Sequence, residues 1–84
     1  PAPVRVEPPQ KLVVLARQPR QRRWILHLLD DGPCTVEIRR EFVPASKVVG
    51  LYPPAGWTCT SEKTAHGLQI KTDGAASDRL VVLQ

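Results

Sequence analysis

The sequence predicts an all-β fold, an antiparallel sandwich of the Greek-key or immunoglobulin-like kind with about seven or eight short strands. Three observations lead to this prediction. Proline, glycine and aspartate breaks recur every 8–12 residues or so, which is the turn spacing of sandwiches and barrels. Apolar and polar residues alternate between several of these breaks. No segment repeats apolar residues at the spacing of an amphipathic helix.

Length and composition limit the chain to one ordinary globular domain. Its 84 residues are too few for two hydrophobic cores, and 42% hydrophobic with 24% charged residues is typical of a folded soluble protein. The longest apolar run, Leu12–Ala16, is far shorter than the roughly 20 residues of a membrane helix, so no membrane partner is expected. The chain begins at Pro1 and contains no Met, which we interpret as a fragment or processed product of unknown compartment.

The first half of the chain divides into an extended segment and three strands. Residues 1–10 are proline-flanked and are expected to form a linker or an edge strand, while residues 11–84 form the sandwich. Lys11–Arg17 is continuously apolar at its centre, which predicts a strand covered on both sides. Arg22–Leu29 places Trp24, Leu26 and Leu28 on one face and Ile25, His27 and Leu29 on the other. Cys34–Arg40 alternates apolar and polar residues, as a half-buried strand does.

A turn and four further strands complete the prediction. The Asp30–Gly32 segment is expected to form a tight hairpin, because glycine tolerates the positive φ of such turns. The later strands are expected at Val48–Leu51, Trp57–Thr60, Leu68–Thr72 and Leu80–Leu83. The residues expected to be mostly buried are Trp24, Leu26, Val36, Ile38, Leu68, Ile70 and Val82.

The chemistry-bearing residues do not form a catalytic pattern. Glycoside hydrolysis needs two carboxylates at a defined separation, one of them held protonated. The eight carboxylates fall almost entirely in turns or at outward strand positions, and we interpret them as solvated charges: Glu7, Asp30, Asp31, Glu37, Glu41, Glu62, Asp73 and Asp78. No serine lies in a nucleophile elbow, and we interpret His27 as a packed histidine and His66 as a solvated one. The isolated chain is therefore not expected to be an enzyme.

The cysteines do not form a metal motif. Cys34 and Cys59 are far apart, and with only His27 and His66 in addition they match no standard zinc spacing. No metal or cofactor is expected. Both cysteines fall on the apolar registers of their strands, so we expect free buried thiols, with a disulfide as the alternative if the protein is exported.

A basic cluster is the first of two speculative binding features. The chain has a net charge of +4, and Arg17, Arg20, Arg22 and Arg23 flank a turn at Pro19. Such a cluster can bind anionic sugars or phosphate backbones, or it can be a solvated hairpin tip that protects a sheet edge. No aromatic residues are interleaved with the arginines as single-strand binders require, so a nucleic-acid partner is not expected.

The second speculative feature is an aromatic pair. Tyr52 and Trp57 flank the Pro53–Gly56 turn, whereas Trp24 alternates with leucines and is assigned to the core. Aromatic faces pack against pyranose rings, so Tyr52 and Trp57 are candidates for contact with a glycan. The alternative interpretation is that both rings pack within the turn.

The order of these segments resembles a known kind of domain. The segments are Lys11-Leu-Val-Val-Leu15, Arg23-Trp-Ile-Leu-His-Leu-Leu-Asp30, Val48-Val-Gly-Leu-Tyr-Pro-Pro-Ala-Gly56, Gly67-Leu-Gln-Ile-Lys71 and Leu80-Val-Val-Leu83. This order is similar to the small C-terminal β-sandwich of bacterial glycoside hydrolases, such as α-L-fucosidases and β-galactosidases with a trimerisation domain. Asp30 stands where that pattern often has Asn. The resemblance covers about Lys11 to Leu83 and transfers no catalytic residue.

Two functional hypotheses follow. The resemblance implies a non-catalytic accessory domain of a larger carbohydrate-active enzyme, which packs against a catalytic barrel of the same parent chain and stabilises or assembles it. It also implies a secreted or periplasmic location. The alternative, from the residues themselves, is an independent module that binds glycan or another anionic ligand through the arginine cluster or the Tyr52/Trp57 pair.

Overall fold

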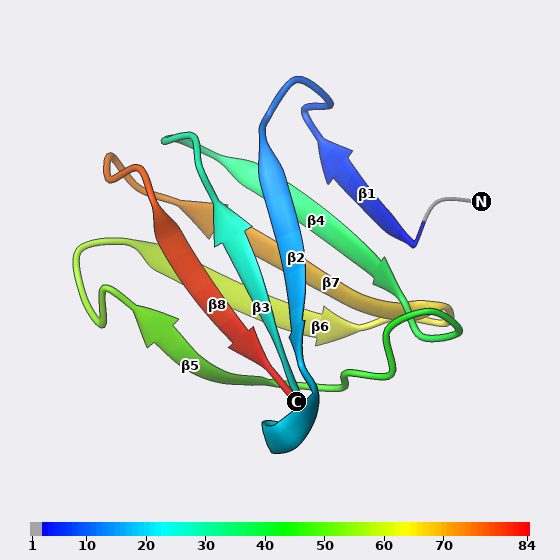
Figure 1. The fold of residues 1–84 in the computed structure, drawn as a ribbon. Helices are drawn as coiled ribbons and strands as arrows, with labels where there is room; N and C mark the ends of the chain where they lie inside the picture. Colours follow the sequence, from blue (N-terminus) through cyan, green and yellow to red (C-terminus); the bar gives the residue numbers. More distant parts are fainter. Residues whose placement is uncertain (1–2) are drawn as a thin grey trace.

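The computed structural model describes residues 3–84 as eight strands in two antiparallel sheets (Figure 1). The predicted all-β sandwich is confirmed. In chain order the elements are β1 (Val4–Glu7), β2 (Val13–Gln18), a 3-10 turn η1 (Pro19–Gln21), β3 (Arg23–Leu28), β4 (Cys34–Arg39), β5 (Val48–Tyr52), β6 (Thr58–Lys63), β7 (Gly67–Asp73) and β8 (Arg79–Leu83).

The chain crosses repeatedly between the two layers. One sheet has the strand order β1-β4-β7-β6 and the other has the order β2-β3-β8-β5, so only β2–β3 and β6–β7 are hairpins between consecutive strands. The remaining connections pass from one sheet to the other, as in Greek-key sandwiches. The strand β1 pairs with β4 as an edge strand of the first sheet. Residues 1 and 2 of the predicted linker or edge strand lie outside the described residues.

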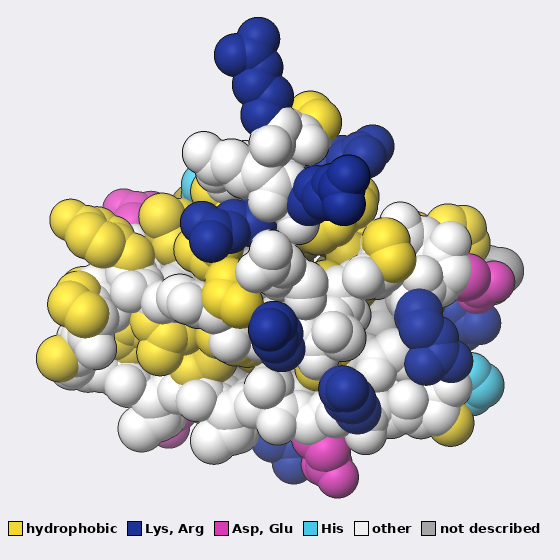
Figure 2. All heavy atoms as spheres, turned by 90° about the horizontal axis from the view of Figure 1, so that it is seen from below, with side chains coloured by type: hydrophobic (Ala, Val, Ile, Leu, Met, Phe, Trp, Pro, Cys, Tyr) yellow, Lys and Arg dark blue, Asp and Glu magenta, His cyan; other side chains and the backbone are white. Residues whose placement is uncertain are grey.

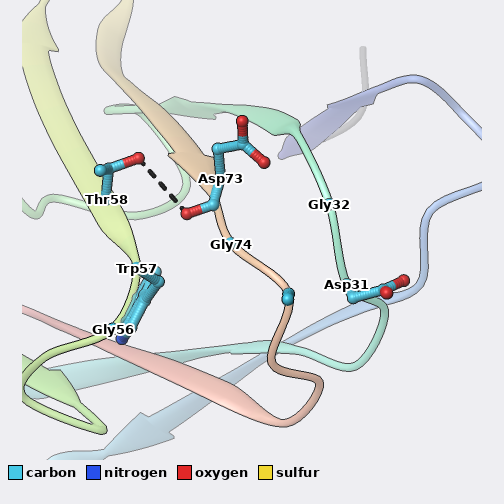
Figure 3. Close-up of a pocket in the computed structure, with 8 residues that line it drawn as sticks. Asp31, Gly32, Gly56, Trp57, Thr58, Asp73 and Gly74 are labelled. Atoms are coloured by element: carbon cyan, nitrogen blue, oxygen red, sulfur yellow. Dashed lines mark hydrogen bonds between the residues drawn. The ribbon is translucent and has the colours of Figure 1, made fainter.

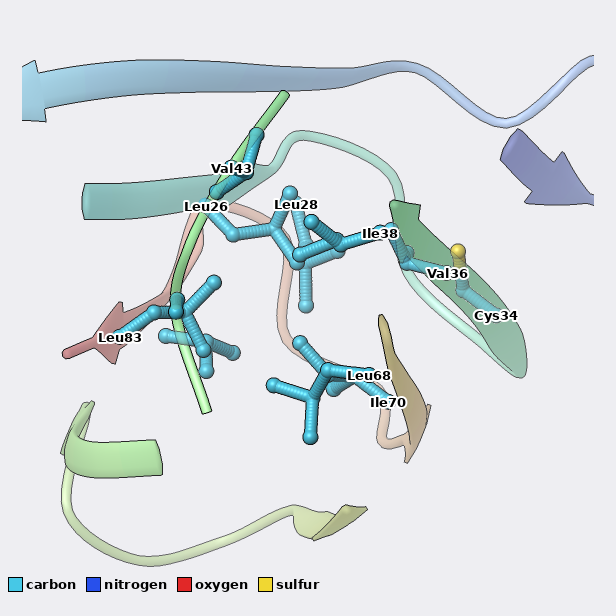
Figure 4. Close-up of a cluster of buried hydrophobic side chains, with 11 residues drawn as sticks. Leu26, Leu28, Cys34, Val36, Ile38, Val43, Leu68, Ile70 and Leu83 are labelled. Atoms are coloured by element: carbon cyan, nitrogen blue, oxygen red, sulfur yellow. The ribbon is translucent and has the colours of Figure 1, made fainter. Parts of the chain in front are cut away.

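The core lies between the sheets and follows from the alternation of the strands (Figure 4). Inward positions are two residues apart along each strand because successive side chains point to opposite faces. Two residues of the connection between β4 and β5 close the core from the side. The buried apolar residues are Leu26, Leu28, Cys34, Val36, Ile38, Val43, Ala45, Leu68, Ile70, Val81 and Leu83.

Most of the predicted core is confirmed, and two of its members differ. Trp24 is only half-buried, although it packs against the core on the predicted face. Val82 points outward and is only half-buried, while its neighbours Val81 and Leu83 point inward, so the prediction that Val82 is mostly buried was wrong. A strand that is apolar at every position carries no alternation from which its inward face can be read.

Two local predictions are also corrected. Asp30–Gly32 does not close a hairpin, because β3 and β4 belong to different sheets and the turn carries the chain between them. Gly32 nevertheless has the expected positive φ of 81°. The strand predicted at Lys11–Arg17 is not covered on both sides, since Val14 is 48% exposed. No helix in residues 3–84 is long and apolar enough to cross a membrane.

Candidate interaction surface

The outer face of the β2-β3-β8-β5 sheet is built almost entirely from apolar side chains. Cross-strand registers arrange it in two rows that run across the strands. The first row contains Val14, His27, Leu80 and Tyr52. The second row contains Ala16, Ile25, Val82 and Gly50. These eight residues are called the apolar face below.

Several large side chains on or beside this face lie open to solvent. Tyr52 is 65% exposed and Val14 is 48% exposed. Leu12, two residues before Val14 on the same side of the chain, is 56% exposed, and Val49 on the edge strand β5 is 39% exposed. Of the large apolar residues that are exposed in the described chain, only Phe42 lies elsewhere, in the connection between β4 and β5.

The outer face of the other sheet is polar. Its register rows consist of charged, hydroxyl and amide side chains: Arg5, Glu7, Thr35, Glu37, Thr60, Glu62, Gln69 and Lys71. The Gln69 amide donates a hydrogen bond of 3.3 Å to the Glu37 carboxylate on this surface. A solvated sheet face normally has this composition. The two outer faces therefore differ in composition, one apolar and the other polar.

Charge is separated along the strands of the apolar face. Arg20, Arg22, Arg23 and Lys47 lie where β2 ends and β3 and β5 begin, a region called the basic end below. Figure 2 views the molecule from this side, and dark blue side chains gather around the β2–β3 turn. No aspartate or glutamate occurs between Glu7 and Asp30.

The opposite end of the same strands is acidic. Exposed Asp30 and Asp31 follow β3, and exposed Asp78 precedes β8; the three are called the acidic end below. The Asp30 carboxylate accepts a 2.8 Å hydrogen bond from the backbone N–H of Leu12. Lys11 also lies here, half-buried, and its ammonium donates to the Asp31 carbonyl at 2.6 Å.

The structure brings the four predicted arginines together at one end of the sheet. Arg17 lies over the ring of Trp24, with the guanidinium carbon 5.6 Å from the ring centroid. Arg22 closes the 3-10 turn in a left-handed conformation, with φ 52°. All four arginines are exposed and lie in or beside the turn that links the paired strands β2 and β3.

Tyr52 and Trp57 do not form a common platform. Tyr52 belongs to the apolar face and points away from the core. Trp57 is half-buried, packs against the core, and donates from its indole Nε1 to the Pro53 carbonyl at 2.7 Å. The two rings lie on opposite sides of the sheet.

Trp57 borders a shallow depression between the ends of β6 and β7 and the β3–β4 turn (Figure 3). Asp31 and Asp73 line the depression, and Gly74 passes so close that a Cβ there would lie 2.5 Å from the Cβ of Trp57. Beneath the ring lies Arg79, which is fully buried. Sequence reasoning missed this arginine, because arginine is rarely buried and no neighbouring residue marks it.

The cysteines occupy one register row of the first sheet. Cys34 and Cys59 both pair with Thr72, so a whole strand separates them. Two strand spacings amount to about 10 Å, which exceeds the roughly 7 Å limit between the Cα atoms of a disulfide. Both thiols are free; Cys34 is buried as expected, whereas Cys59 is only half-buried, because its strand β6 lies at the edge of the sheet. Burial raises the pKa of each thiol; for Cys34, nearby Arg79 and Lys11 oppose that effect.

The carboxylates lie at the surface and form no cluster with the histidines or cysteines within residues 3–84. All eight carboxylates are exposed, in agreement with the interpretation of solvated charges. Within residues 3–84 no three His, Cys, Asp or Glu side chains gather in a way that could hold a metal ion. An ion pair joins Arg39 to Glu41 at 2.7 Å, but both side chains are substantially exposed.

Comparison with protein-family models, curated protein sequences and solved structures gives no match to this chain.

The apolar face was not identified from the sequence, although a signal for it was present. The runs Leu12–Ala16 and Leu80–Leu83 are apolar at every position, unlike the alternating Cys34–Arg39. Continuous apolar strands occur where both faces of a sheet are covered. The sequence thus indicates a cover on the outer face of this sheet, and no segment within residues 3–84 supplies it.

Proposed function

We propose that this chain is a non-catalytic accessory domain, a β-sandwich that contributes a packing surface to a larger protein assembly. The apolar face is the observation that carries this proposal. Its strands have the composition of a sheet buried on both sides, yet Tyr52 and Val14 are largely exposed. Contiguous apolar patches of a few hundred Å² on soluble domains commonly mark interaction sites. The face is therefore assigned to contact with another folded protein surface.

The placement of the charged residues supports a role in packing. A general acid in glycoside hydrolysis needs a carboxyl group that burial keeps protonated. Each carboxylate of this chain is exposed to water. The proposal gives no side chain of this chain a role in breaking a bond.

The parent protein is the part of the proposal that rests on sequence patterns. The strand-and-turn resemblance to the C-terminal sandwiches of bacterial glycoside hydrolases supports a carbohydrate-active parent. A secreted or periplasmic location rests on the same resemblance. Under that hypothesis, a catalytic barrel of the parent chain is a candidate to cover the apolar face.

Binding of a neutral solvatochromic dye such as Nile red tests the packing surface. At high dilution, the folded chain should enhance the dye fluorescence, because the exposed apolar side chains provide a binding surface. Val14→Ser and Tyr52→Ser should lower the signal. Phe42→Ser is the matched control, since Phe42 is 47% exposed but lies outside the apolar face. Circular dichroism checks that each variant keeps its strands.

Two results would count against the proposal. One is a dye signal that Phe42→Ser lowers as much as Tyr52→Ser does. The other is turnover in an aryl-glycoside panel that disappears when Asp31 or Asp73 is changed to Asn. We expect no turnover from the isolated chain.

Binding of an anionic ligand is the second candidate function. The observation that favours it is the basic end, where Arg20, Arg22 and Arg23 are exposed in a segment without acidic residues. Sulfated or carboxylated glycans match this charge. Heparin binding that weakens with salt and is lost when the three arginines are replaced by Ser tests this function.

A further inference from the structure

We propose that a second copy of this chain covers the apolar face. This inference rests on the proposed function and names the partner. Two copies pack face to face, with their strands antiparallel, around a twofold axis that lies in the interface and crosses the strands. Each strand then lies over its own counterpart in the other copy. Face-to-face sheets usually align their strands within about 30°, which permits this arrangement.

Side-chain size supports the arrangement. The twofold axis places the first row of one copy over the second row of the other, because the direction along the strands is reversed. Tyr52 then meets Gly50, the large exposed ring over the position without a side chain. Val14 likewise meets the smaller Ala16. Interfaces of good complementarity interdigitate in this way.

The two central strands, β3 and β8, also place their outward side chains opposite one another in this arrangement. Leu80 meets Val82, and His27 meets Ile25, so the imidazole lies against an aliphatic side chain. The surface above Gly50 can receive the Tyr52 ring of the other copy. Even a Cβ built on Gly50 would meet only the Val82 side chain of its own copy, at an ordinary contact distance of 3.5 Å. The face is therefore self-complementary when one copy is reversed.

Charge supports the same orientation. With β3 reversed over its counterpart, Arg23 at its start in one copy lies opposite Leu29 of the other and therefore next to Asp30, just beyond the end of that strand. The basic end of each copy thus meets the acidic end of its partner, and the contact occurs twice. Complementary potentials of this kind set the orientation of an interface.

The alternative twofold axis, parallel to the strands, is disfavoured by the same charges. It would lay β2 over β5 and bring the two basic ends together, with Arg20, Arg22 and Arg23 of one copy near Lys47 of the other. Like charges brought together across an interface repel each other and disfavour the association. A catalytic barrel or an unrelated protein could also cover an apolar face, but neither accounts for its reversed match of size and charge.

The size of the face determines how strong the association should be. The face is four strands wide, at about 4.8 Å per strand, and about five residues long, at about 3.3 Å per residue, which gives a plan area of roughly 300 Å². Two copies with their charged ends remain below the roughly 1,200 Å² of standard interfaces, which is the range of weak complexes. We therefore expect a reversible dimer.

Sedimentation equilibrium tests the dimer. The mass of the chain should rise from one copy to two between about 1 µM and about 1 mM, the range that brackets a weak association. Tyr52→Ser should lower the association constant by about tenfold. Phe42→Ser should leave it unchanged. Thermal denaturation at low concentration confirms that each variant folds.

A charge exchange tests the orientation. Arg23→Asp should lower the association constant at least about tenfold, because two aspartates then face each other at both contacts. Asp30→Arg should also lower it, and the double variant should restore most of the association. Lys71→Asp, on the polar sheet, is the control and should have no effect.

Each outcome separates this inference from the proposed function. A chain that stays monomeric at every concentration overturns the second-copy inference. A double variant, Arg23→Asp with Asp30→Arg, whose association constant is no higher than that of either single variant also overturns it. A dye signal that depends on Tyr52 would still support a packing surface for a different partner. If the dye signal does not depend on Tyr52 and the chain is also monomeric at every concentration, both the second-copy inference and the proposed packing surface are overturned.

Discussion

The guanidinium of Arg79 lies 5.5 Å from the centroid of the Trp57 ring, in a site that is closed to water. Its Nη2 donates to the backbone carbonyls of Asp30 and Gly32, at 2.6 and 3.2 Å. Nε and Nη1 have no hydrogen-bond partner within the described residues. A buried cation is costly unless its surroundings compensate, and the face of an indole ring is attractive to it. Arg79 and Trp57 together hold the start of β8 against the β3–β4 turn.

Replacement of Trp57 should therefore destabilise the fold. We expect Trp57→Ala to lower the free energy of unfolding by about 2–4 kcal/mol, because the ring packs on the core and covers the guanidinium. Tyr52→Ala is the matched control, since its ring is 65% exposed, and should change stability by less than about 0.5 kcal/mol in dilute solution. Urea denaturation measures both. Equal losses in the two variants would show that the Arg79–Trp57 contact contributes little.

A second prediction concerns Gly67, at the start of β7. A Cβ at this position would overlap the carbonyl oxygen of Ile38 and lie 2.9 Å from the backbone nitrogen of Arg40. The atoms in contact with this Cβ belong to the backbone of the paired strand, which cannot change rotamer to make room as a side chain can. Gly67→Ala should cost about 1–3 kcal/mol of stability.

Gly50 provides the control for this substitution. A Cβ at Gly50 meets only the Val82 side chain, at an ordinary contact distance of 3.5 Å. Gly50→Ala should therefore be neutral or stabilising, by up to about 1 kcal/mol, since it restricts the unfolded chain. Thermal unfolding of dilute samples compares the two variants. A tolerated Gly67→Ala would mean that β4 and β7 separate more easily than their register indicates.

Most of the fold could be predicted because its strands alternate. Val36 and Ile38 were placed correctly on the inner face, since Thr35 and Glu37 between them mark the outer one. Leu80–Leu83 has no such marker, so its inward residues were misassigned. Strand pairing was also beyond local patterns: Asp30–Gly32 has the residues of a hairpin turn, but long-range packing sends the chain to the other sheet.

The candidate surface was harder to predict than the fold. The cluster of Arg20, Arg22 and Arg23 could be predicted because these charged residues lie close together in the sequence. The structure places them at the basic end of the sheet. The apolar face is drawn from four strands that are not consecutive in the chain. Its residues resemble core residues individually, and only the sheet order shows that they share an uncovered side.

The thiols predict a dependence of stability on pH. Burial raises the pKa of Cys34 and Cys59 above that of the same thiols in the unfolded chain. The unfolded state therefore loses these protons first as pH rises. The stability contributed by the protonated thiols is fully present below the unfolded thiol pKa of about 8.5 and declines as pH rises above it.

Urea midpoints at about pH 7 and about pH 9.5 should show this decline. The double variant Cys34→Ala/Cys59→Ala should be less stable at neutral pH but should lose less on going to the higher pH. In the native wild type, an aromatic disulfide reagent should react with half-buried Cys59 before Cys34, which is 5% exposed. A wild-type midpoint as insensitive to pH as that of the double variant would contradict the assignment of raised thiol pKa values.

The last prediction separates the two roles of the basic end. Replacement of Arg20, Arg22 and Arg23 by Ser should change the free energy of unfolding by less than about 0.5 kcal/mol per site, because all three side chains are exposed.

If the arginines bind an anionic ligand, the wild type should bind heparin with an affinity that falls steeply with salt, and the triple variant should not bind. If they serve only to orient a second copy of the chain, heparin should bind weakly or not at all, while the triple variant dimerises less than the wild type. Titration with heparin and with duplex DNA at two salt concentrations, beside sedimentation of both proteins, measures the two effects independently. Salt-sensitive binding at micromolar strength that leaves dimerisation of the triple variant intact would assign the basic end to an anionic glycan and remove its part in the dimer.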